Sequence, residues 1–418
     1  MLKKEVYLKF VFLFMIFILS CTYVFADDLE PLDDEFDIAQ EIENINSMEA
    51  SSSTSSLPTI NSRAYVVIDR KSSNVIIGKN ENQKKKMAST TKIMTALIVI
   101  DNCNLSDTVT ISKKAAGTGG SRLGLKTGDK ITINDLLYGL MLRSGNDAAV
   151  ALAEHTSGSI SDFATLMNDK AIQLGLENTH FVTPHGLDQD EHYTTAYELA
   201  LLTNYALNNK TFSKIVATKN YTININGYSK ALNNTNELLG SLNGVYGVKT
   251  GFTNGANRCL VTSCKRGDMD VICVVLGADT KKFRTQDSIK LINYTFDNFS
   301  YVNINEKIEN HFNDWLKQNI NNFDIYKGLN NNVDLYYEQL ECPFIPIRND
   351  LIDNINITID CETNLTAPLF QDDVIGSIVV YLDNDILYNI DIKLKTNLKK
   401  KTVFNYMIEF LRKISQLY

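Results

Sequence analysis

The sequence predicts an α+β fold, in which an antiparallel sheet flanked by helices is followed by a small all-β domain. The first observation is a pair of β-rich runs, residues 64–69 and 75–78, on either side of a polar turn. The second is another hairpin pattern late in the chain, residues 258–264 and 270–277. Strands at both ends with helical sequence between them are typical of a single sheet covered by helices. The third is an alternating apolar pattern beyond residue 301.

The helical part of this prediction rests on three segments. Residues 89–102 carry apolar side chains on every face, which predicts a buried helix. Residues 134–175 are predicted to form a mostly helical insertion, interrupted at Gly145 and Gly158. Residues 283–296 have an amphipathic pattern and are predicted to form a further helix.

Residues 1–26 have the order of a secretory signal peptide. Lysines precede an apolar run over residues 10–19, and Val24-Phe25-Ala26 offers a small-residue cleavage site. An uncleaved anchor is one alternative, although the run is shorter than the roughly 20 residues that span a bilayer. A lipoprotein-type site ending at Cys21 is another. We therefore expect an exported protein at the outer face of the cytoplasmic membrane or in the cell wall.

Residues 27–61 are predicted to form a disordered linker, first acidic and then rich in serine. The net charge of the chain is −8, and residues 27–62 contain ten acidic side chains and no lysine or arginine. The acidity is therefore concentrated in this linker, and the sequence after it is neutral overall. Because nucleic-acid binding needs a basic domain, no nucleic-acid partner is expected.

The last part of the chain divides into two predicted segments. Residues 301–395 are expected to form a C-terminal β domain, because apolar residues alternate within residues 355–360 and 375–381. Residues 396–418 combine three lysines with apolar side chains at helical spacing. This pattern predicts a basic amphipathic helix that associates with a membrane surface. The alternative is a terminal helix packed on its own domain.

A Ser-x-x-Lys motif, Ser89-Thr90-Thr91-Lys92, begins the predicted buried helix. Residues three apart share one helix face, so Ser89 and Lys92 are expected to lie together. The helix N-terminus favours negative charge that develops near Ser89. Burial disfavours the ammonium form of Lys92 and lowers its pKa, which would allow Lys92 to take the proton of Ser89. We predict a catalytic nucleophile and its base.

Two further motifs follow in order, Ser144-Gly145-Asn146 and Lys249-Thr250-Gly251. Ser144 is predicted to be the third catalytic residue, which relays a proton to the leaving amine, and Asn146 is predicted to bind a substrate amide. Lys249 and Thr250 suit a substrate carboxylate. Gly251 permits close approach of a substrate backbone to the edge of a strand.

With these three motifs in this order, the chain resembles the low-molecular-mass penicillin-binding proteins of the D-alanyl-D-alanine carboxypeptidase family, serine peptidases of the S11 type. The resemblance includes the stretch 178–187 and covers residues 62–300. It implies a transpeptidase fold like that of penicillin-binding proteins and β-lactamases, with residues 62–300 as the catalytic domain. It implies a serine-type D-Ala-D-Ala carboxypeptidase that acts on the peptidoglycan pentapeptide, is inhibited covalently by β-lactams and uses no cofactor or metal.

The resemblance also implies roles for individual residues. Ser89 would attack the carbonyl between the two terminal D-alanines. The backbone N–H groups of Ser89 and Phe252 would form the oxyanion hole. Arg284 matches in position the arginine that meets the substrate carboxylate. Family members often have histidine at the position of Phe252, and this difference changes the side chain but keeps the backbone donor.

Three alternatives remain open at this point. A DD-endopeptidase and a serine β-lactamase share the three motifs, and a non-catalytic peptidoglycan-binding or penicillin-sensing protein could use the same fold. Class A β-lactamases need an additional glutamate, and none between Asn146 and Lys249 stands out as its equivalent. Residues His180, His185 and His192 lack the spacing of a helical metal site and are predicted to be structural.

Overall fold

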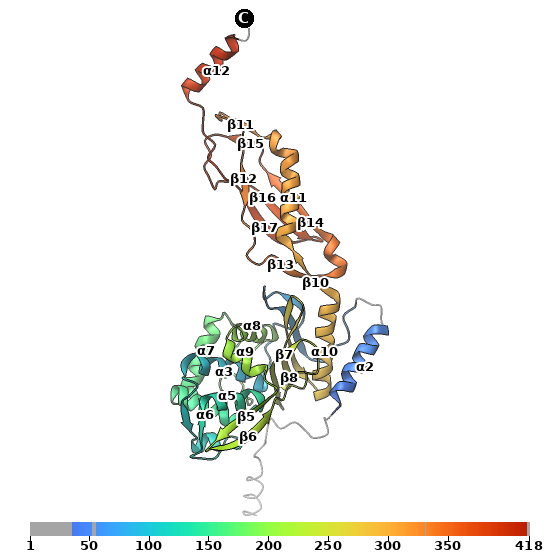
Figure 1. The fold of residues 1–418 in the computed structure, drawn as a ribbon, viewed down its shortest axis with the longest axis vertical. Helices are drawn as coiled ribbons and strands as arrows, with labels where there is room; N and C mark the ends of the chain where they lie inside the picture. Colours follow the sequence, from blue (N-terminus) through green and yellow to red (C-terminus); the bar gives the residue numbers. More distant parts are fainter. Residues whose placement is uncertain (1–35, 52–55, 331, 416–418) are drawn as a thin grey trace, which may run out of the picture. The chain divides into compact units, whose positions relative to one another are not determined.

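The computed structural model describes residues 36–51, 56–330 and 332–415 (Figure 1). The chain divides into two compact units, with the boundary between Asp297 and Asn298. Each unit has its own core of apolar side chains. The predicted signal peptide, residues 1–26, lies outside the described residues.

The first unit is built on a five-stranded antiparallel sheet with the strand order β2-β1-β9-β8-β7. Its strands are β1 (Ala64–Asp69), β2 (Val75–Lys79), β7 (Val245–Thr253), β8 (Asn257–Arg266) and β9 (Met269–Ala278). Both predicted hairpins are present, and β1 pairs with β9, so sequence from the two ends of the unit closes one sheet. The predicted α+β fold class is confirmed.

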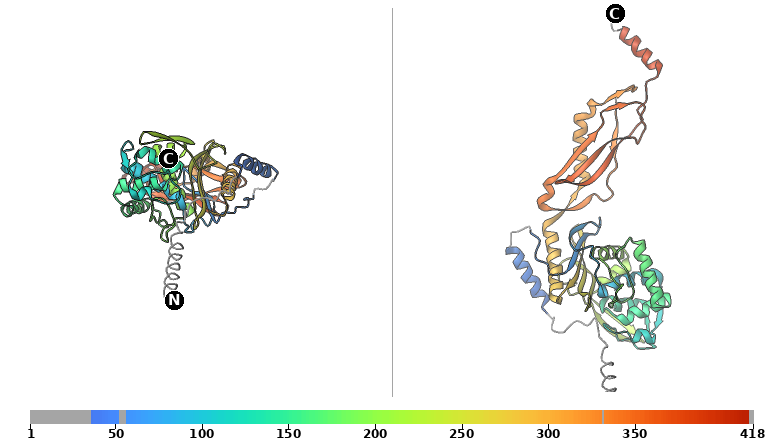
Figure 2. Two further views of the ribbon diagram at one scale, coloured as in Figure 1. Left: turned by 90° about the horizontal axis from the view of Figure 1, so that it is seen from below. Right: turned by 180° about the vertical axis from the view of Figure 1, so that it is seen from behind.

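Helices cover both faces of this sheet (Figures 1 and 2). The larger group is formed by α3 (Lys92–Asn102), α5 (Ile133–Leu142), α6 (Asn146–Ser157), α7 (Ile160–Gln173), α8 (Ala196–Leu207) and α9 (Lys210–Val216). On the other side lies α10 (Lys281–Asn298). Smaller elements complete the unit: η2 (Ala88–Thr91), α4 (Lys113–Ala116), and the pairs β3 (Thr108–Thr110) with β4 (Lys130–Thr132) and β5 (Asn220–Ile225) with β6 (Tyr228–Asn233).

Local sequence explains where the inserted helices begin and end. Thr132 and Ser159 cap α5 and α7, since each side-chain oxygen accepts a hydrogen bond from the backbone N–H three residues later. Gly158 ends α6 with a φ of 81°, a left-handed conformation that glycine adopts without steric cost. Gly145 caps α6, so both predicted interruptions lie at helix boundaries.

The predicted disordered linker, residues 27–61, is wrong for residues 38–51, which form helix α2 (Ile38–Ser51). Its Glu41 is buried, contacts the side chain of Gln286 and forms an ion pair with Lys282 on α10. Ile45 is also buried. An acidic segment reads as disordered by composition alone, but here the basic residues of α10 provide its partners.

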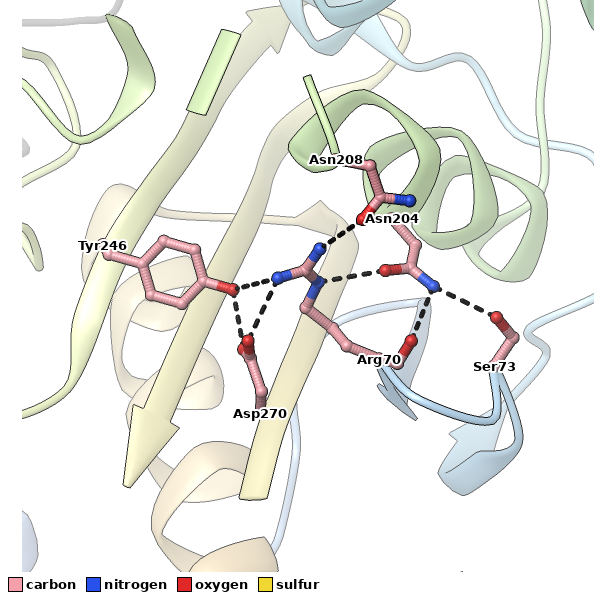
Figure 3. A network of polar contacts seen from close by, with 6 residues as sticks. All are labelled: Arg70, Ser73, Asn204, Asn208, Tyr246 and Asp270. Carbon is pink, nitrogen blue, oxygen red and sulfur yellow. Dashed lines mark hydrogen bonds and ion pairs between the residues drawn. The ribbon is translucent and has the colours of Figure 1, made fainter. Parts of the chain in front are cut away.

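A polar network ties two strands of the sheet and the turn after β1 to α8 (Figure 3). Its members come from the turn after β1, from α8 and the residue that follows it, and from β7 and β9: Arg70, Ser73, Asn204, Asn208, Tyr246 and Asp270. The guanidinium of Arg70 donates to Asp270 and to Tyr246, each at 3.0 Å, and the Tyr246 hydroxyl donates to Asp270 at 2.6 Å. Burial and the bond to Asp270 raise the pKa of Tyr246, so its hydroxyl stays a donor. The network anchors the start of β7, the strand that carries the third motif.

The second unit is a small β domain that also contains a helix. A four-stranded sheet has the order β12-β17-β16-β14, and two-stranded pairs join β10 to β13 and β11 to β15. Its elements are β10 (Phe299–Asn303), α11 (Ile304–Asn319), η3 (Ile320–Asn322), β11 (Asp324–Tyr326), β12 (Leu335–Tyr337), β13 (Phe344–Arg348), η4 (Asn349–Asn354), β14 (Ile355–Cys361), β15 (Asn364–Thr366), β16 (Val374–Leu382), β17 (Asp385–Leu394) and α12 (Val403–Ser415).

Helix α11 was not expected from the sequence. It buries Ile304, Ile308 and Phe312 in the same core as Ile378 and Ile392 of the sheet. These three residues are four apart, so they form one apolar stripe on an otherwise polar helix. A four-stranded sheet with one apolar face needs such a cover.

Candidate active site

Ser89 and Lys92 lie side by side at the start of the buried helix. Ser89 belongs to the short 3-10 helix η2, and Lys92 is the first residue of α3. Lys92 is completely buried, and its Nζ lies 2.6 Å from Ser89 Oγ. The same Nζ donates to Asn146 Oδ1 at 2.7 Å and to the backbone carbonyl of His185 at 2.9 Å. The first motif and the asparagine of the second are thus brought together.

The second motif forms the turn between α5 and α6. Ser144 has a φ of 60°, and Asn146 donates through Nδ2 to the Gly119 carbonyl at 2.9 Å. The next residue, Asp147, is buried and accepts backbone N–H groups from residues 123–125. These bonds hold the 119–125 loop against the turn, because a buried carboxylate needs such donors.

The third motif lies on β7, at the edge of the sheet beside Ser89. A Cβ atom on Gly251 would lie 3.1 Å from the backbone nitrogen of Ser89 and 3.2 Å from the carbonyl oxygen of Met87. Glycine therefore allows the strand to pass close to residues 87–89, the turn that contains Ser89 and is called the nucleophile turn below. Lys249 is buried, with its Nζ bonded to the Thr250 carbonyl at 2.8 Å. The Thr250 hydroxyl bonds that of Thr235, also at 2.8 Å.

These motifs surround a cavity of about 670 Å³. Its lining consists of Ser89, Gly120, Ser121, Arg122, Arg143, Ser144, Asn234, Thr235, Glu237, Thr250, Gly251, Phe252, Lys281 and Arg284. Six of the nine predicted site residues line it: Ser89, Ser144, Thr250, Gly251, Phe252 and Arg284. The other three, Lys92, Asn146 and Lys249, are buried behind the lining and reach it through the contacts described above.

Glu237 is a cavity residue that the sequence analysis missed. It lies between Asn146 and Lys249, where no glutamate stood out from the sequence. Its Oε1 is 2.5 Å from Nη2 of Arg284 and accepts the Thr285 hydroxyl at 2.7 Å. Burial alone would raise the pKa of Glu237, but the charge of Arg284 and the Thr285 bond outweigh it and hold that pKa below its usual value. Glu237 is therefore an anion at neutral pH.

His185 and His192 support the nucleophile turn from the 180–192 loop. Nδ1 of His192 accepts the Val182 N–H at 2.9 Å, so its Nε2 carries the proton and donates to Thr91 Oγ1 at 2.8 Å. The carbonyl of His185 accepts from Lys92. The His185 ring accepts the Leu187 N–H through Nδ1 at 3.2 Å. Burial lowers the pKa of His185 to about 3 and that of His192 to about 4.

These two pKa values predict a loss of stability in mild acid. Both histidines are neutral in the folded and unfolded states above pH about 6.5, so their contribution is complete there. Below that pH the two histidines bind protons in the unfolded chain but stay neutral in the folded chain. The free energy of unfolding therefore falls by up to about 2.7 kcal/mol per pH unit, until the pH reaches the folded-state pKa values of about 4 and about 3.

Urea unfolding between pH 7.5 and 4.5 measures this slope. His192→Gln should make it shallower, whereas His155→Gln, at an exposed histidine on α6, should leave it unchanged. Equal slopes in both variants and the parent protein would contradict the prediction.

Known proteins are similar to this chain in sequence and in fold. The family model described as D-alanyl-D-alanine carboxypeptidase, peptidase S11, matches residues 51–280. The chain belongs to the D-alanyl-D-alanine carboxypeptidase family. A second model, for the C-terminal domain of penicillin-binding protein 5, matches residues 317–400. Membership implies a serine-type carboxypeptidase with a D-Ala-D-Ala peptide as substrate and the ability to bind penicillin.

Individual relatives of this carboxypeptidase cover most of its length. It is 32% identical to the D-alanyl-D-alanine carboxypeptidase DacF of Bacillus subtilis over 351 residues, 82% of this chain and 88% of the relative. Penicillin-binding protein 5 of Haemophilus influenzae superposes with a TM-score of 0.65 at 29% identity, covering 82% of this chain and 99% of that one. The carboxypeptidase DacD of Francisella tularensis superposes with a TM-score of 0.68 at 25% identity, covering 83% and 96%.

Proposed function

We propose that this carboxypeptidase removes the terminal D-alanine from peptidoglycan pentapeptides through an acyl-enzyme on Ser89. Lys92 takes the hydroxyl proton as Ser89 Oγ attacks the carbonyl carbon between the two D-alanines. The N–H groups of Ser89 and Phe252 stabilise the oxyanion. The tetrahedral intermediate collapses when the peptide C–N bond breaks, and Ser144 passes a proton to the leaving amine.

A water molecule then completes the reaction. It adds to the acyl carbonyl, loses a proton to the same base, and releases the shortened peptide and a free Ser89 hydroxyl. β-Lactams would acylate Ser89 by the same attack, with opening of the lactam ring in place of amine departure. The observation that carries the proposal is the 2.6 Å contact between Lys92 Nζ and Ser89 Oγ, because it joins base and nucleophile at the cavity wall.

The charges of the cavity support an anionic peptide as substrate. Among the described residues, the cavity is lined by one carboxylate, that of Glu237, and by four basic side chains: Arg122, Arg143, Lys281 and Arg284. A carboxypeptidase substrate carries a terminal carboxylate, and an arginine binds such a group with two parallel hydrogen bonds. We assign this contact to Arg284, with Lys249 and Thr250 completing the carboxylate side and Asn146 and Gly251 binding the peptide backbone.

The same residues argue against a β-lactamase. Hydrolysis of the penicillin adduct in class A enzymes needs a glutamate that activates water. Glu237 is the glutamate that lines the cavity, but its Oε1 is already engaged by Arg284 and Thr285. We therefore expect a slowly hydrolysed penicillin adduct.

The test is a set of incubations of the purified enzyme with three substrates. We expect release of D-alanine from a pentapeptide and little hydrolysis of a penicillin. Cleavage of a cross-linked peptide dimer in preference to the pentapeptide would indicate an endopeptidase instead. Rapid turnover of the penicillin without D-alanine release would indicate a β-lactamase, and neither activity would indicate a binding or sensing protein.

We also propose that the enzyme works outside the cell at the membrane, with residues 62–300 as catalytic domain, residues 301–395 as β domain and residues 396–418 as membrane-associating helix. Helix α12 supports this. Its apolar side chains are strongly exposed, with Phe404 63% and Phe410 65% accessible. Lys399, Lys400 and Lys401 precede the helix. No helix within the described residues is long and apolar enough to cross a bilayer.

Vesicle binding tests the helix directly. The full chain is expected to co-sediment with vesicles that contain anionic lipid. The double variant Phe404→Asp with Phe410→Asp should lower its binding constant about tenfold or more, since two aromatic rings that would insert into the membrane surface are lost. Ile172→Asp, at an exposed isoleucine of α7, is the matched control and should bind normally. Unchanged binding by the double variant would contradict the assignment.

A further inference from the structure

The cavity contains a carboxylate of the enzyme's own, that of Glu237, and it contacts Arg284, the residue to which the proposed function assigns the substrate carboxylate. Glu237 Oε1 forms an ion pair with Arg284 Nη2 at 2.5 Å. Arg284 is only 1% exposed, and both residues line the cavity that Ser89 lines. Lys281 adds a second positive charge that acts on Glu237. A peptide carboxylate that reaches Arg284 therefore meets a guanidinium that is already engaged.

The loop between β6 and β7 holds Glu237 in this place. On one side, the Asn236 side chain donates to the Gly247 carbonyl at 3.0 Å. On the other, Leu238 is completely buried. Before them, the Thr235 N–H donates to the Leu142 carbonyl at 3.1 Å. Because the residues on both sides of Glu237 are held in place, the backbone presents its side chain to the cavity wall.

The Glu237 carboxylate is only half satisfied. Oε1 accepts hydrogen bonds from both Arg284 and Thr285, whereas Oε2 is buried and has no hydrogen-bond partner among the described residues. A buried acceptor without a donor is unfavourable. Glu237 therefore binds Arg284 more weakly than a carboxylate with two parallel hydrogen bonds would. A substrate carboxylate can displace it.

We propose that Glu237 is a specificity-determining residue that competes with the terminal carboxylate of the substrate for Arg284. This inference rests on the proposed function, which assigns Arg284 to that carboxylate. Glu237 weakens ground-state binding of peptides with a free carboxyl terminus and so raises their KM. Glu237 also competes with the product, because the released D-alanine carries the carboxylate that contacts Arg284. When Glu237 returns to Arg284, the release of D-alanine is favoured.

Glu237→Gln tests this with two matched peptides. One ends in D-Ala-D-Ala with a free carboxylate, and the other has the same sequence with a C-terminal amide. Glutamine keeps an oxygen for Arg284 and Thr285 but removes the charge. We expect the KM of the free acid to fall about tenfold, the size of one unit charge a few ångströms away in a partly solvated site, with kcat within about twofold and the amide unaffected. The inhibition constant of free D-alanine should fall by a similar factor.

Glu177→Gln removes the same charge at an exposed position and should change none of these constants. A higher KM or a lower kcat for the acid in Glu237→Gln would overturn the proposal and show that Glu237 instead positions Arg284. Equal effects on acid and amide would overturn it as well. Glu237→Ala makes the same comparison if the glutamine variant folds poorly.

Two further readouts separate this inference from the function on which it rests. If the parent enzyme neither releases D-alanine nor reacts with penicillin, the proposed function fails. If the parent enzyme is active but Arg284→Gln has the same ratio of KM values for the acid and amide peptides as the parent, Arg284 does not bind the substrate carboxylate. The proposed competition with Glu237 then fails as well. If Arg284→Gln loses the discrimination but the Glu237 variants keep the constants of the parent, the inference about Glu237 is wrong and the proposed function stands.

Discussion

Replacement of Lys92 by methionine is expected to slow the acylation of Ser89 by about 10³-fold or more. The Nζ atom of Lys92 lies 2.6 Å from Ser89 Oγ, and a positioned base contributes about 10²–10⁴-fold to such a step. Methionine has nearly the same length and no charge, so the buried space stays filled. The loss should therefore appear in the chemistry rather than in the packing.

The rate of acylation by a fluorescent penicillin measures this effect in the full chain. Lys114→Met, at an exposed lysine of α4, is the control and should react at the parent rate. Circular dichroism and thermal unfolding verify that Lys92→Met is folded. A folded Lys92→Met variant that is acylated within tenfold of the parent rate would exclude Lys92 as the base.

The second large effect is expected from Gly186→Ala. Gly186 has a φ of +88°, and a Cβ atom there would lie 2.0 Å from the carbonyl oxygen of Ala88. That carbonyl belongs to the residue before the nucleophile, so the clash must displace the Ser89 turn or the 180–192 loop. A shift of about 1 Å in catalytic geometry costs on the order of 10²-fold in rate. We expect acylation to fall by about 10²-fold or more, together with a lower free energy of unfolding.

Gly175→Ala separates the two causes of this effect. Gly175 also has a positive φ, +70°, but a Cβ atom there would meet nothing within 4 Å. Its variant should lose about 1–2 kcal/mol of stability from the backbone strain alone and keep its acylation rate. If the two variants lose activity equally, steric displacement of the nucleophile turn is not the cause.

The catalytic motifs could be predicted because each is a short run whose neighbours already suggest its setting. Ser89 and Lys92 share a helix face by their spacing alone, and Gly145 is a helix breaker in sequence that lies at the N-terminal boundary of α6. The apolar residues of α3 predict its burial in the same way. Local patterns therefore predicted the fold class and the proximity of Ser89 and Lys92, whereas the contact of Lys92 with Asn146, 54 residues away, is seen only in the structure.

Features that depend on distant partners could not be predicted in this way. Glu237 meets Arg284 across 47 residues, and Glu41 of α2 meets Gln286 across 245. Each of these acidic residues reads as a solvated charge until its partner is known. The apolar stripe of α11 was concealed by the asparagine-rich composition of that region, and only the facing sheet explains why it folds.

Formation of an acyl-enzyme on Ser89 is the claim on which the account depends most. The direct measurement is intact-mass analysis of the full chain after incubation with benzylpenicillin, followed by peptide mapping of the modified residue and comparison with Ser89→Ala. The proposed mechanism predicts one penicillin per chain, attached to Ser89, persisting for many minutes and absent in the variant. An adduct on another residue, or an equal adduct in Ser89→Ala, would contradict it.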